Sequence, residues 1–299
     1  MIPNQFIAFL VGFIDGDGYI QITKTTKGFI AIKLVIALQL KDLSTLEYIQ
    51  SVLDIGKISI SKDQRSPLCK LIINRTDLQE VLFPLLFHHN IFFLTKSRRD
   101  QFDLAIHIFK QDIKHFDMID TFLDFHLQSA LAPAPFYTAQ RCYVARASNG
   151  GEGVKLQVSK EQIPVQFLLP NKALDYLNLP FFKNWIIGFT AAEGSFLIKS
   201  NNDGCFQLKQ RIHVELFEAF KLVFNTERKV VVLWTTENSL YNQFSVSSKK
   251  DIQTVINFFS FSGLHPLIGL KSIQYFNWLN NLKNSKRYQN LNFPPASCA

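Results

Sequence analysis

The stretch LVGFIDGDG occupies residues 10–18, and a close copy of it, IIGFTAAEG, occupies residues 186–194. The second copy begins 176 residues after the first (186 − 10). Each copy is an apolar run with one embedded glycine, and each ends in a carboxylate followed by another glycine. An internal repeat of this kind predicts two similarly folded halves, and therefore two similar carboxylates that could meet at one site.

The embedded glycines, Gly12 and Gly188, indicate how the two halves meet. A glycine in a helix interior costs about 1 kcal/mol relative to alanine, but it lets a second backbone come close. Two such helices packed glycine to glycine would place their C-terminal ends side by side, which brings Asp17 and Glu193 together. Neighbouring carboxylates repel each other unless a cation lies between them, and hard oxygen ligands suit Mg²⁺.

The composition of the 299-residue chain bounds the class of protein. Hydrophobic residues make up 47% of the chain, which is ample for a core. No apolar run approaches the ~20 residues of a membrane helix, and the sequence does not open with a signal-peptide pattern, so we expect no membrane association. The four cysteines lie far apart without a CxxC pair, which favours a reduced compartment and argues against a zinc site.

The net charge of +8 points to a polyanionic partner, and its distribution along the chain is more informative. Residues 1–115 carry a net charge of +3 and residues 181–299 carry +6, whereas residues 116–180 carry −1. The positive charge thus lies in the two repeat halves and not between them. A basic, solvated surface without a partner is the alternative explanation.

The hydrophobic patterns predict the same order of elements in both halves, αββαββαα, and hence an α+β fold with antiparallel sheets. We assign residues 1–115 and 181–299 to the two halves and residues 116–180 to a long connecting segment. Asp42 is expected to be the N-cap of the second helix. The expected helices cover residues 4–15, 42–53, a short stretch from 76, 95–110, 182–192, 213–225, 249–259 and 267–282, and the expected strands cover residues 19–24, 29–41, 57–61, 68–74, 195–200, 205–211, 228–235 and 243–248.

The two copies resemble the paired signature motifs of the LAGLIDADG family, in its single-chain branch of homing endonucleases encoded within group I introns. The resemblance covers residues 4–110 and 181–283 and leaves the connecting segment unmatched. It implies two αββαββα halves related by a pseudo-two-fold axis, each with a saddle-like antiparallel β-sheet. The halves would pack through the two LAGLIDADG helices, with Gly12 and Gly188 at the helix seam.

By the same resemblance, Asp17 and Glu193 are metal-binding carboxylates, one from each motif. The residues before them, Gly16 and Ala192, complete the predicted metal-ligand set. Mg²⁺ is the expected cofactor. We expect Mn²⁺ to substitute for it, and Ca²⁺ to support DNA binding without cleavage.

The second motif departs from the family pattern, because Thr190, Ala191 and Ala192 replace the usual Ile-Asp-Ala. In the first motif, Asp15 matches a position that is not a metal ligand. Its counterpart in this chain is Ala191, so the two-fold relation argues against an essential role for Asp15.

Three further residues are predicted to take part in catalysis. Lys96 and Lys271 match the lysine that the family places at the start of the late helix in each half. They lie 79 and 78 residues after the carboxylate of their own half (96 − 17 and 271 − 193), so we interpret them as a pair and not as two exposed charges. Gln210 matches a solvent-organising polar residue, whereas the first half has Leu40 at that place, beside Gln39.

The strands carry the prediction of DNA recognition. A two-stranded β-ribbon can enter the major groove, and alternate residues along each strand would then face the base edges. Arginine pairs well with guanine, and glutamine or asparagine with adenine, whereas lysines can touch phosphates only. A solvated strand face is the alternative for any single residue, and the sequence leaves open which alternation faces the DNA. The candidates are Gln21, Thr23, Lys24, Lys33, Lys62, Arg65, Lys70 and Arg75 in the first half and Lys199, Asn201, Lys209, Arg211, Arg228 and Lys229 in the second.

Together these patterns predict a site-specific endonuclease that acts as a monomer on double-stranded DNA. The resemblance implies a long, non-palindromic site and Mg²⁺-dependent hydrolysis of both strands to leave 3′ overhangs. Two alternatives stay open: a maturase that binds group I intron RNA and assists its splicing, and a non-catalytic DNA-binding protein of the same fold. Both carboxylates are intact, which favours the nuclease. The AT-biased composition, with 29 Phe, fits an organelle-encoded, mitochondrial protein.

Overall fold

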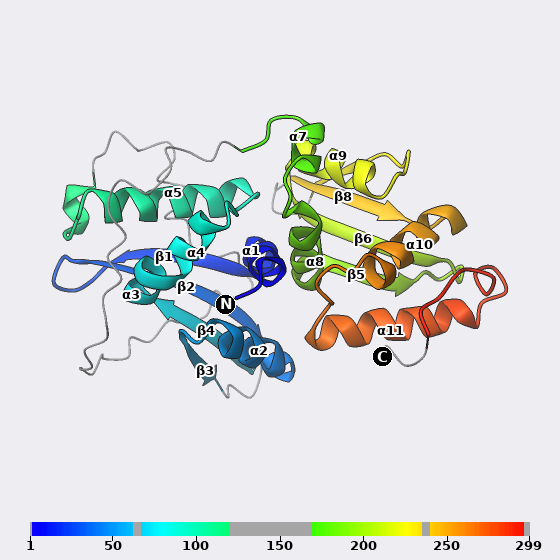
Figure 1. The fold of residues 1–299 in the computed structure, drawn as a ribbon, viewed down its shortest axis with the longest axis horizontal. Coiled ribbons are helices and arrows are strands. Elements are labelled where there is room, and N and C mark those ends of the chain that lie inside the picture. Colours follow the sequence, from blue (N-terminus) through cyan, green and yellow to red (C-terminus); the bar gives the residue numbers. More distant parts are fainter. Residues whose placement is uncertain (1, 62–66, 120–168, 235–239, 296–299) are drawn as a thin grey trace.

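The computed structural model describes residues 2–61, 67–119, 169–234 and 240–295 of the chain. Two antiparallel four-stranded sheets lie on either side of a central pair of helices, α1 (Asn4–Asp17) and α8 (Phe182–Glu193) (Figure 1). The strand orders are β1-β2-β4-β3 and β5-β6-β8-β7, so the second sheet repeats the topology of the first. The predicted α+β fold with two related halves is confirmed.

Each half places one helix after its second strand and further helices after its fourth. In the first half the remaining elements are β1 (Gly18–Lys24), β2 (Ile30–Gln39), α2 (Leu43–Leu53), β3 (Lys57–Ser61), β4 (Leu68–Asn74), α3 (Arg75–Asp77), α4 (Phe83–His88) and α5 (Lys96–Lys110). In the second half they are β5 (Gly194–Ile198), β6 (Gly204–Arg211), α9 (Val214–Val223), β7 (Val231–Trp234), β8 (Leu240–Val246), α10 (Lys249–Ile256) and α11 (Gly269–Lys283).

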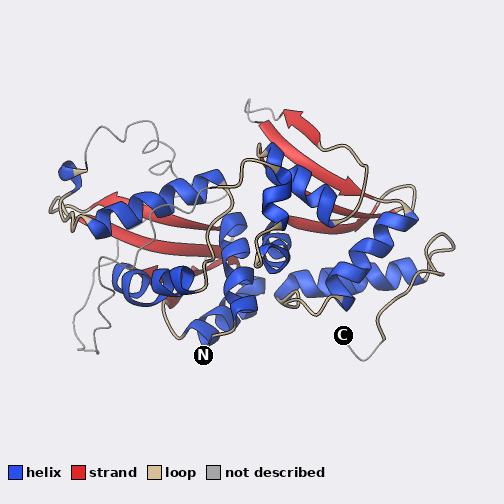
Figure 2. Ribbon diagram, turned by 45° about the horizontal axis from the view of Figure 1, so that its top comes forward, coloured by secondary structure: helices blue, strands red, loops and turns tan. Residues whose placement is uncertain are grey.

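Among the described residues, helices cover one face of each sheet and leave the other face open (Figure 2). In β1, Ile20 and Ile22 are buried beneath helices, whereas Tyr19 and Gln21, which alternate with them, are partly exposed. This alternation is the period of two that a half-buried strand requires. The same alternation runs along β8, where Phe244 and other apolar residues face the helices.

Several element boundaries differ from the sequence-based expectation. Helix α1 continues to Asp17, two residues beyond the predicted end, so the motif carboxylate is the last residue of the helix. The second strand ends at Gln39 and passes into a 3-10 turn, Leu40–Asp42. The helix expected from residue 76 is interrupted by a π-helical turn before Pro84, because proline lacks the N–H that the α-helical ladder needs there.

The last strand also begins earlier than predicted, at Leu240 instead of residue 243. Within the predicted connecting segment the structure describes a 3-10 turn, Phe116–Met118, and a short helix, α7 (Ala173–Leu177), which packs on α9. The domain boundaries themselves stay a prediction. Among the described residues, no helix is both long enough and apolar enough to span a membrane.

Candidate active site

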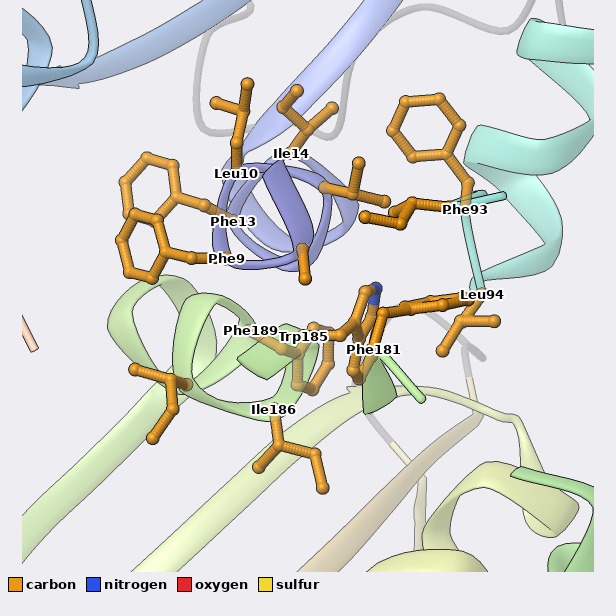
Figure 3. Packing of buried hydrophobic residues seen from close by; sticks show 14 of the residues in the cluster. Phe9, Leu10, Phe13, Ile14, Phe93, Leu94, Phe181, Trp185, Ile186 and Phe189 are labelled. Carbon is orange, nitrogen blue, oxygen red and sulfur yellow. The ribbon is translucent and has the colours of Figure 1, made fainter. Parts of the chain in front are cut away.

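The two central helices lie side by side (Figure 3). They touch backbone to backbone at Gly12 and Gly188. A Cβ atom added at Gly12 would overlap the carbonyl oxygen of Trp185, and one added at Gly188 would overlap the carbonyl oxygen of Phe9. Each obstacle lies three residues before the glycine of the partner helix, so the two contacts are related by the pseudo-two-fold axis. The helix seam therefore needs both glycines, as a close approach of two backbones does.

One turn further along, Gly16 and Ala192 bring the C-terminal ends of the helices together. A Cβ atom on Gly16 would overlap the Cβ of Ala192 and lie 3.0 Å from the Cγ of Glu193. Asp17 and Glu193, the final residues of α1 and α8, therefore lie beside each other across the seam. The structure thus brings the two predicted carboxylates to one place.

Burial is the main influence on both carboxylates. It raises the pKa of Asp17 to about 6, with the Asp42 charge adding to the rise and the Lys271 and Arg98 charges opposing it. Burial raises the pKa of Glu193 to about 7, and the neighbouring Asp17 charge raises it further. A buried pair of acids with raised pKa values lacks sufficient positive charge around it, which is the setting that a divalent cation would stabilise.

Lys271, in the first turn of α11, lies at this carboxylate pair. Its Nζ donates a hydrogen bond to the carbonyl of Gly194, the residue after Glu193. Burial lowers the pKa of Lys271, and the charges of Asp17 and Glu193 oppose that fall. The predicted position of Lys271 near the acids thus agrees with the geometry.

Lys96 does not lie at the carboxylate pair, contrary to the sequence-based expectation. Its side chain is 68% exposed and forms an ion pair with Asp100, one turn along α5, at 2.8 Å. In the first half, Arg98 is the cation that acts on the carboxylate pair. It is 7% exposed, and its Nε donates a hydrogen bond to the carbonyl of Ile14 at 3.4 Å. Burial lowers the pKa of Arg98, and Asp15, Glu193 and Asp17 act against this shift.

Gln210 contacts the site directly. Its Nε2 donates a hydrogen bond to Oε1 of Glu193 at 3.1 Å, and its own Oε1 accepts from the backbone of Arg211 at 2.8 Å. The side-chain amide therefore fixes the orientation of the Glu193 carboxylate. In the first half, Gln39 ends β2 as an exposed residue, so the two halves differ here as predicted from the sequence.

Asp15 is 1% exposed and joins three elements. It accepts hydrogen bonds from the backbone N–H groups of Leu94 and Thr95 (2.8 and 3.2 Å), from the Thr95 hydroxyl (2.5 Å) and from Nε1 of Trp185 (2.8 Å). Burial raises the pKa of Asp15 to about 6 despite these donors. Asp15 therefore fastens the start of α5 to the motif helices. The sequence did not indicate this structural role, because the second motif has Ala191 at the corresponding position.

Comparison with known proteins adds independent evidence. The model of the LAGLIDADG endonuclease family matches residues 10–109, which include the first motif and the first sheet. The fold is similar to that of I-SmaMI bound to an uncleaved DNA target in the presence of calcium ions. The match covers 93% of this chain and 90% of the I-SmaMI chain, with 19% identity and a TM-score of 0.60. The chain has the two-domain LAGLIDADG fold. The meganuclease I-AabMI bound to uncleaved DNA matches 92% of this chain over 89% of its own (21% identity, TM-score 0.57), and the homing endonuclease I-LtrWI bound to target DNA matches 92% over 88% (18% identity, TM-score 0.58).

The first LAGLIDADG half presents polar residues on the open face of its sheet. Gln21 and Lys33 are cross-strand partners between β1 and β2, and Lys70 of β4 pairs with Ala37 of β2 on the same face. Thr23, two residues after Gln21 on β1, lies on the same face of the sheet. Four of the predicted DNA contacts therefore share one surface.

Two predicted contacts of this half point elsewhere. Lys24 directly follows Thr23, so it lies on the other face of the strand, and it forms an ion pair with Asp117 at 2.6 Å. Arg75 lies on the helix-covered side, with its guanidinium carbon 5.3 Å from the centre of the Phe109 ring. Lys62 and Arg65 lie outside the described residues.

The second LAGLIDADG half has its own set of open-face residues. Lys209 and Arg211 of β6 pair with Gln243 and Tyr241 of β8, and the Lys209 ammonium lies 4.9 Å from the centre of the Tyr241 ring. Tyr241 is not among the predicted contacts, because the strand predicted from the sequence begins two residues after it. The remaining candidates, Lys199, Asn201, Arg228 and Lys229, are exposed in the segments next to β5 and β7.

The C-terminal ends of the two LAGLIDADG helices can hold a divalent cation only together with other ligands. The described residues contain no cluster of three or more His, Cys, Asp and Glu side chains that could hold a metal alone. The seam offers two buried carboxylates whose charges Lys271 and Arg98 offset only in part. Mg²⁺ commonly takes one or two carboxylates and completes its shell with water and substrate phosphate, so the residues present fit this ion.

Proposed function

We propose that this protein is a homing endonuclease that cuts both strands of double-stranded DNA at a long, non-palindromic site. The observation that supports this proposal best is the meeting of Asp17 and Glu193 at the glycine seam, beside the cations of Lys271 and Arg98. The similarity to solved endonucleases bound to DNA supports it from the fold.

The two open sheet faces would hold the DNA, one over each half-site. Their strand orders are the same, but their polar residues differ: Gln21 and Lys33 stand in the first sheet, and Lys209 and Tyr241 in the second. Each half would therefore read a different sequence, and the site need not be a palindrome.

The residues at the seam would perform the chemistry. Asp17 and Glu193, with the residues before them, would hold Mg²⁺, which when bound supplies Lewis-acid chemistry for hydrolysis of a phosphodiester. Gln210 holds the Glu193 carboxylate in a fixed orientation. Lys271 and Arg98 would place positive charge where negative charge develops on the scissile phosphates.

Substitution of the carboxylates tests this proposal. Asp17→Asn and Glu193→Gln keep the side-chain shape but remove a metal-binding charge, so each should lower double-strand cleavage by more than about 10²-fold. The substrate is a duplex selected for binding from a randomised DNA pool in Ca²⁺, and cleavage is measured after transfer to Mg²⁺.

Both variants should bind the selected duplex in Ca²⁺-free buffer as the parent does. Glu47→Gln, a charge removal on the exposed side of α2, is the matched control and should cut normally. Cutting of both strands by the Asp17→Asn/Glu193→Gln double variant would refute the site assignment. Tight binding to a structured RNA and to no DNA duplex, with no Mg²⁺-dependent cutting, would favour the maturase.

A further inference from the structure

Helix α11 carries Lys271 but has no cap of its own. Ile268 occupies its N-cap position, and its first turn contains no acidic residue. The first N–H groups of a helix need acceptors, and a helix end without them is poorly fixed. The position of Lys271 therefore depends on an acceptor from elsewhere in the chain.

That acceptor is Asp42, from the other half of the protein. Its Oδ1 accepts a hydrogen bond from the backbone N–H of Leu270 at 3.0 Å and another from the Thr45 hydroxyl at 2.7 Å. Leu270 is 228 residues away in sequence and immediately precedes Lys271. Asp42 does stand at the N-cap position of α2, as predicted, but its side chain makes no capping bond to that helix.

Gly269 shows that the joint between Asp42 and α11 is tightly packed. A Cβ atom at this position would overlap the Thr45 hydroxyl oxygen and Oδ1 of Asp42, and the backbone has φ 58°, a conformation that favours glycine. Tyr48 of α2 adds a second link nearby, since its hydroxyl lies 3.2 Å from Nε2 of His265. The start of α11 is thus seated on α2 of the opposite half.

The two late helices are fastened in different ways. The start of α5 is held by Asp15 from the motif helix of its own half. The second motif has Ala191 at the corresponding place, so α11 receives no such carboxylate from α8. Asp42, on the other side of the seam, supplies the hydrogen-bond acceptor that Ala191 lacks.

We propose that Asp42 is a positioning residue for Lys271, an inference that rests on the proposed endonuclease function. A carboxylate at a helix N-terminus satisfies an amide donor and interacts favourably with the helix dipole. By fixing the end of α11, Asp42 holds the Lys271 ammonium at the Gly194 carbonyl and beside Asp17 and Glu193. Catalysis is sensitive to displacements of this kind, which cost up to about a hundredfold in rate per ångström.

The test compares Asp42→Ala with Asp42→Asn in the full-length chain. Alanine removes the acceptor, and single-turnover cleavage of the selected duplex in Mg²⁺ should fall by about ten- to one-hundredfold, with binding in Ca²⁺ changed by less than about threefold. Asparagine keeps an Oδ1 acceptor without the charge, and most of the rate should return. Glu47→Ala, which removes an exposed carboxylate from the same helix, should cut at the parent rate.

A double-variant comparison shows whether Asp42 acts through Lys271. In a Lys271→Ala background the further change to Asp42→Ala should alter the rate by less than about twofold, because the group that Asp42 positions is already gone. An equal loss in both backgrounds would overturn the proposal, and so would a parent rate in the single Asp42→Ala variant.

Amide hydrogen exchange gives a readout that needs no cleavage. Asp42→Ala should speed exchange of the Leu270 amide by at least about tenfold, with amides in the β6 strand unchanged. If the parent protein cuts no DNA but this change is seen, the endonuclease proposal fails while the anchoring of the lysine-bearing helix stands. Unchanged exchange at Leu270 would refute the anchoring itself.

Discussion

Lys96 and Lys271 occupy matching places in the sequence repeat but lie in different surroundings. Lys271 is half-buried, touches the backbone after Glu193 and interacts with both carboxylates. Lys96 is exposed, and its ammonium is engaged by Asp100. Repeat spacing alone cannot separate these cases, because a difference of one or two positions at a helix start turns a side chain by 100° or 200° about the helix axis.

We predict that alanine at these two positions has very different effects. Lys271→Ala should lower single-turnover cleavage by about 10²- to 10³-fold, as the loss of one charge-stabilising group does. Lys96→Ala should leave the rate within about threefold of the parent, because an exposed ion pair contributes little. A comparable loss for both variants would show that Lys96 moves into the site when DNA binds.

At the scale of elements, the seam between α1 and α8 decides how the halves sit together. Gly12 and Gly188 each face a backbone carbonyl of the other helix, and a backbone cannot yield as a flexible side chain can. The sequence revealed this contact because the same glycine recurs in both copies of the motif. It could not reveal the anchoring of α11, since Asp42 looks like an ordinary cap for the helix that follows it.

We predict that Gly12→Ala and Gly188→Ala each lower the free energy of unfolding by about 1–3 kcal/mol, because the cost of overpacking exceeds the gain in helix propensity. The effect of the double substitution should be smaller than the sum, since helices already pushed apart by one methyl group accommodate the second more easily. Equilibrium denaturation in urea measures these differences. Strict additivity would mean that the two contacts yield independently of each other.

At the scale of the whole molecule, the chain has a net charge of +8, and both open sheet faces carry basic residues: Lys33 and Lys70 on the first, Lys209 and Arg211 on the second. The sequence predicted the two halves, the order of their elements along the chain and several of the open-face residues, because alternation along a strand is a local signal. It placed Lys24 and Arg75 on the wrong side, since the end of a strand and the start of the next helix break that alternation. Arg98 was missed because a buried arginine has no periodic pattern of its own.

We predict that binding to the selected duplex in Ca²⁺ weakens steeply with salt, as expected when lysines and arginines neutralise phosphates. Lys33→Ala combined with Lys70→Ala should reduce the slope of log affinity against log salt by up to about two. Lys110→Ala combined with Lys183→Ala, two changes on helices, should leave the slope unchanged. Equal slopes for all three proteins would argue against the open face as the DNA-binding surface.

The hydrogen bond from Leu270 to Asp42 makes the two halves unequal, because it is not repeated at the corresponding place of the second half. Where the first half has Asp42 before its α2 helix, the second half has His213 before α9, and the His213 ring is engaged by the Tyr176 hydroxyl at 3.0 Å. Two copies of the second half, assembled as a symmetric dimer, would therefore leave each lysine-bearing helix without its anchor. The second half thus depends on the first for the support of its lysine-bearing helix, and a pairing of the second half with itself would not replace that support.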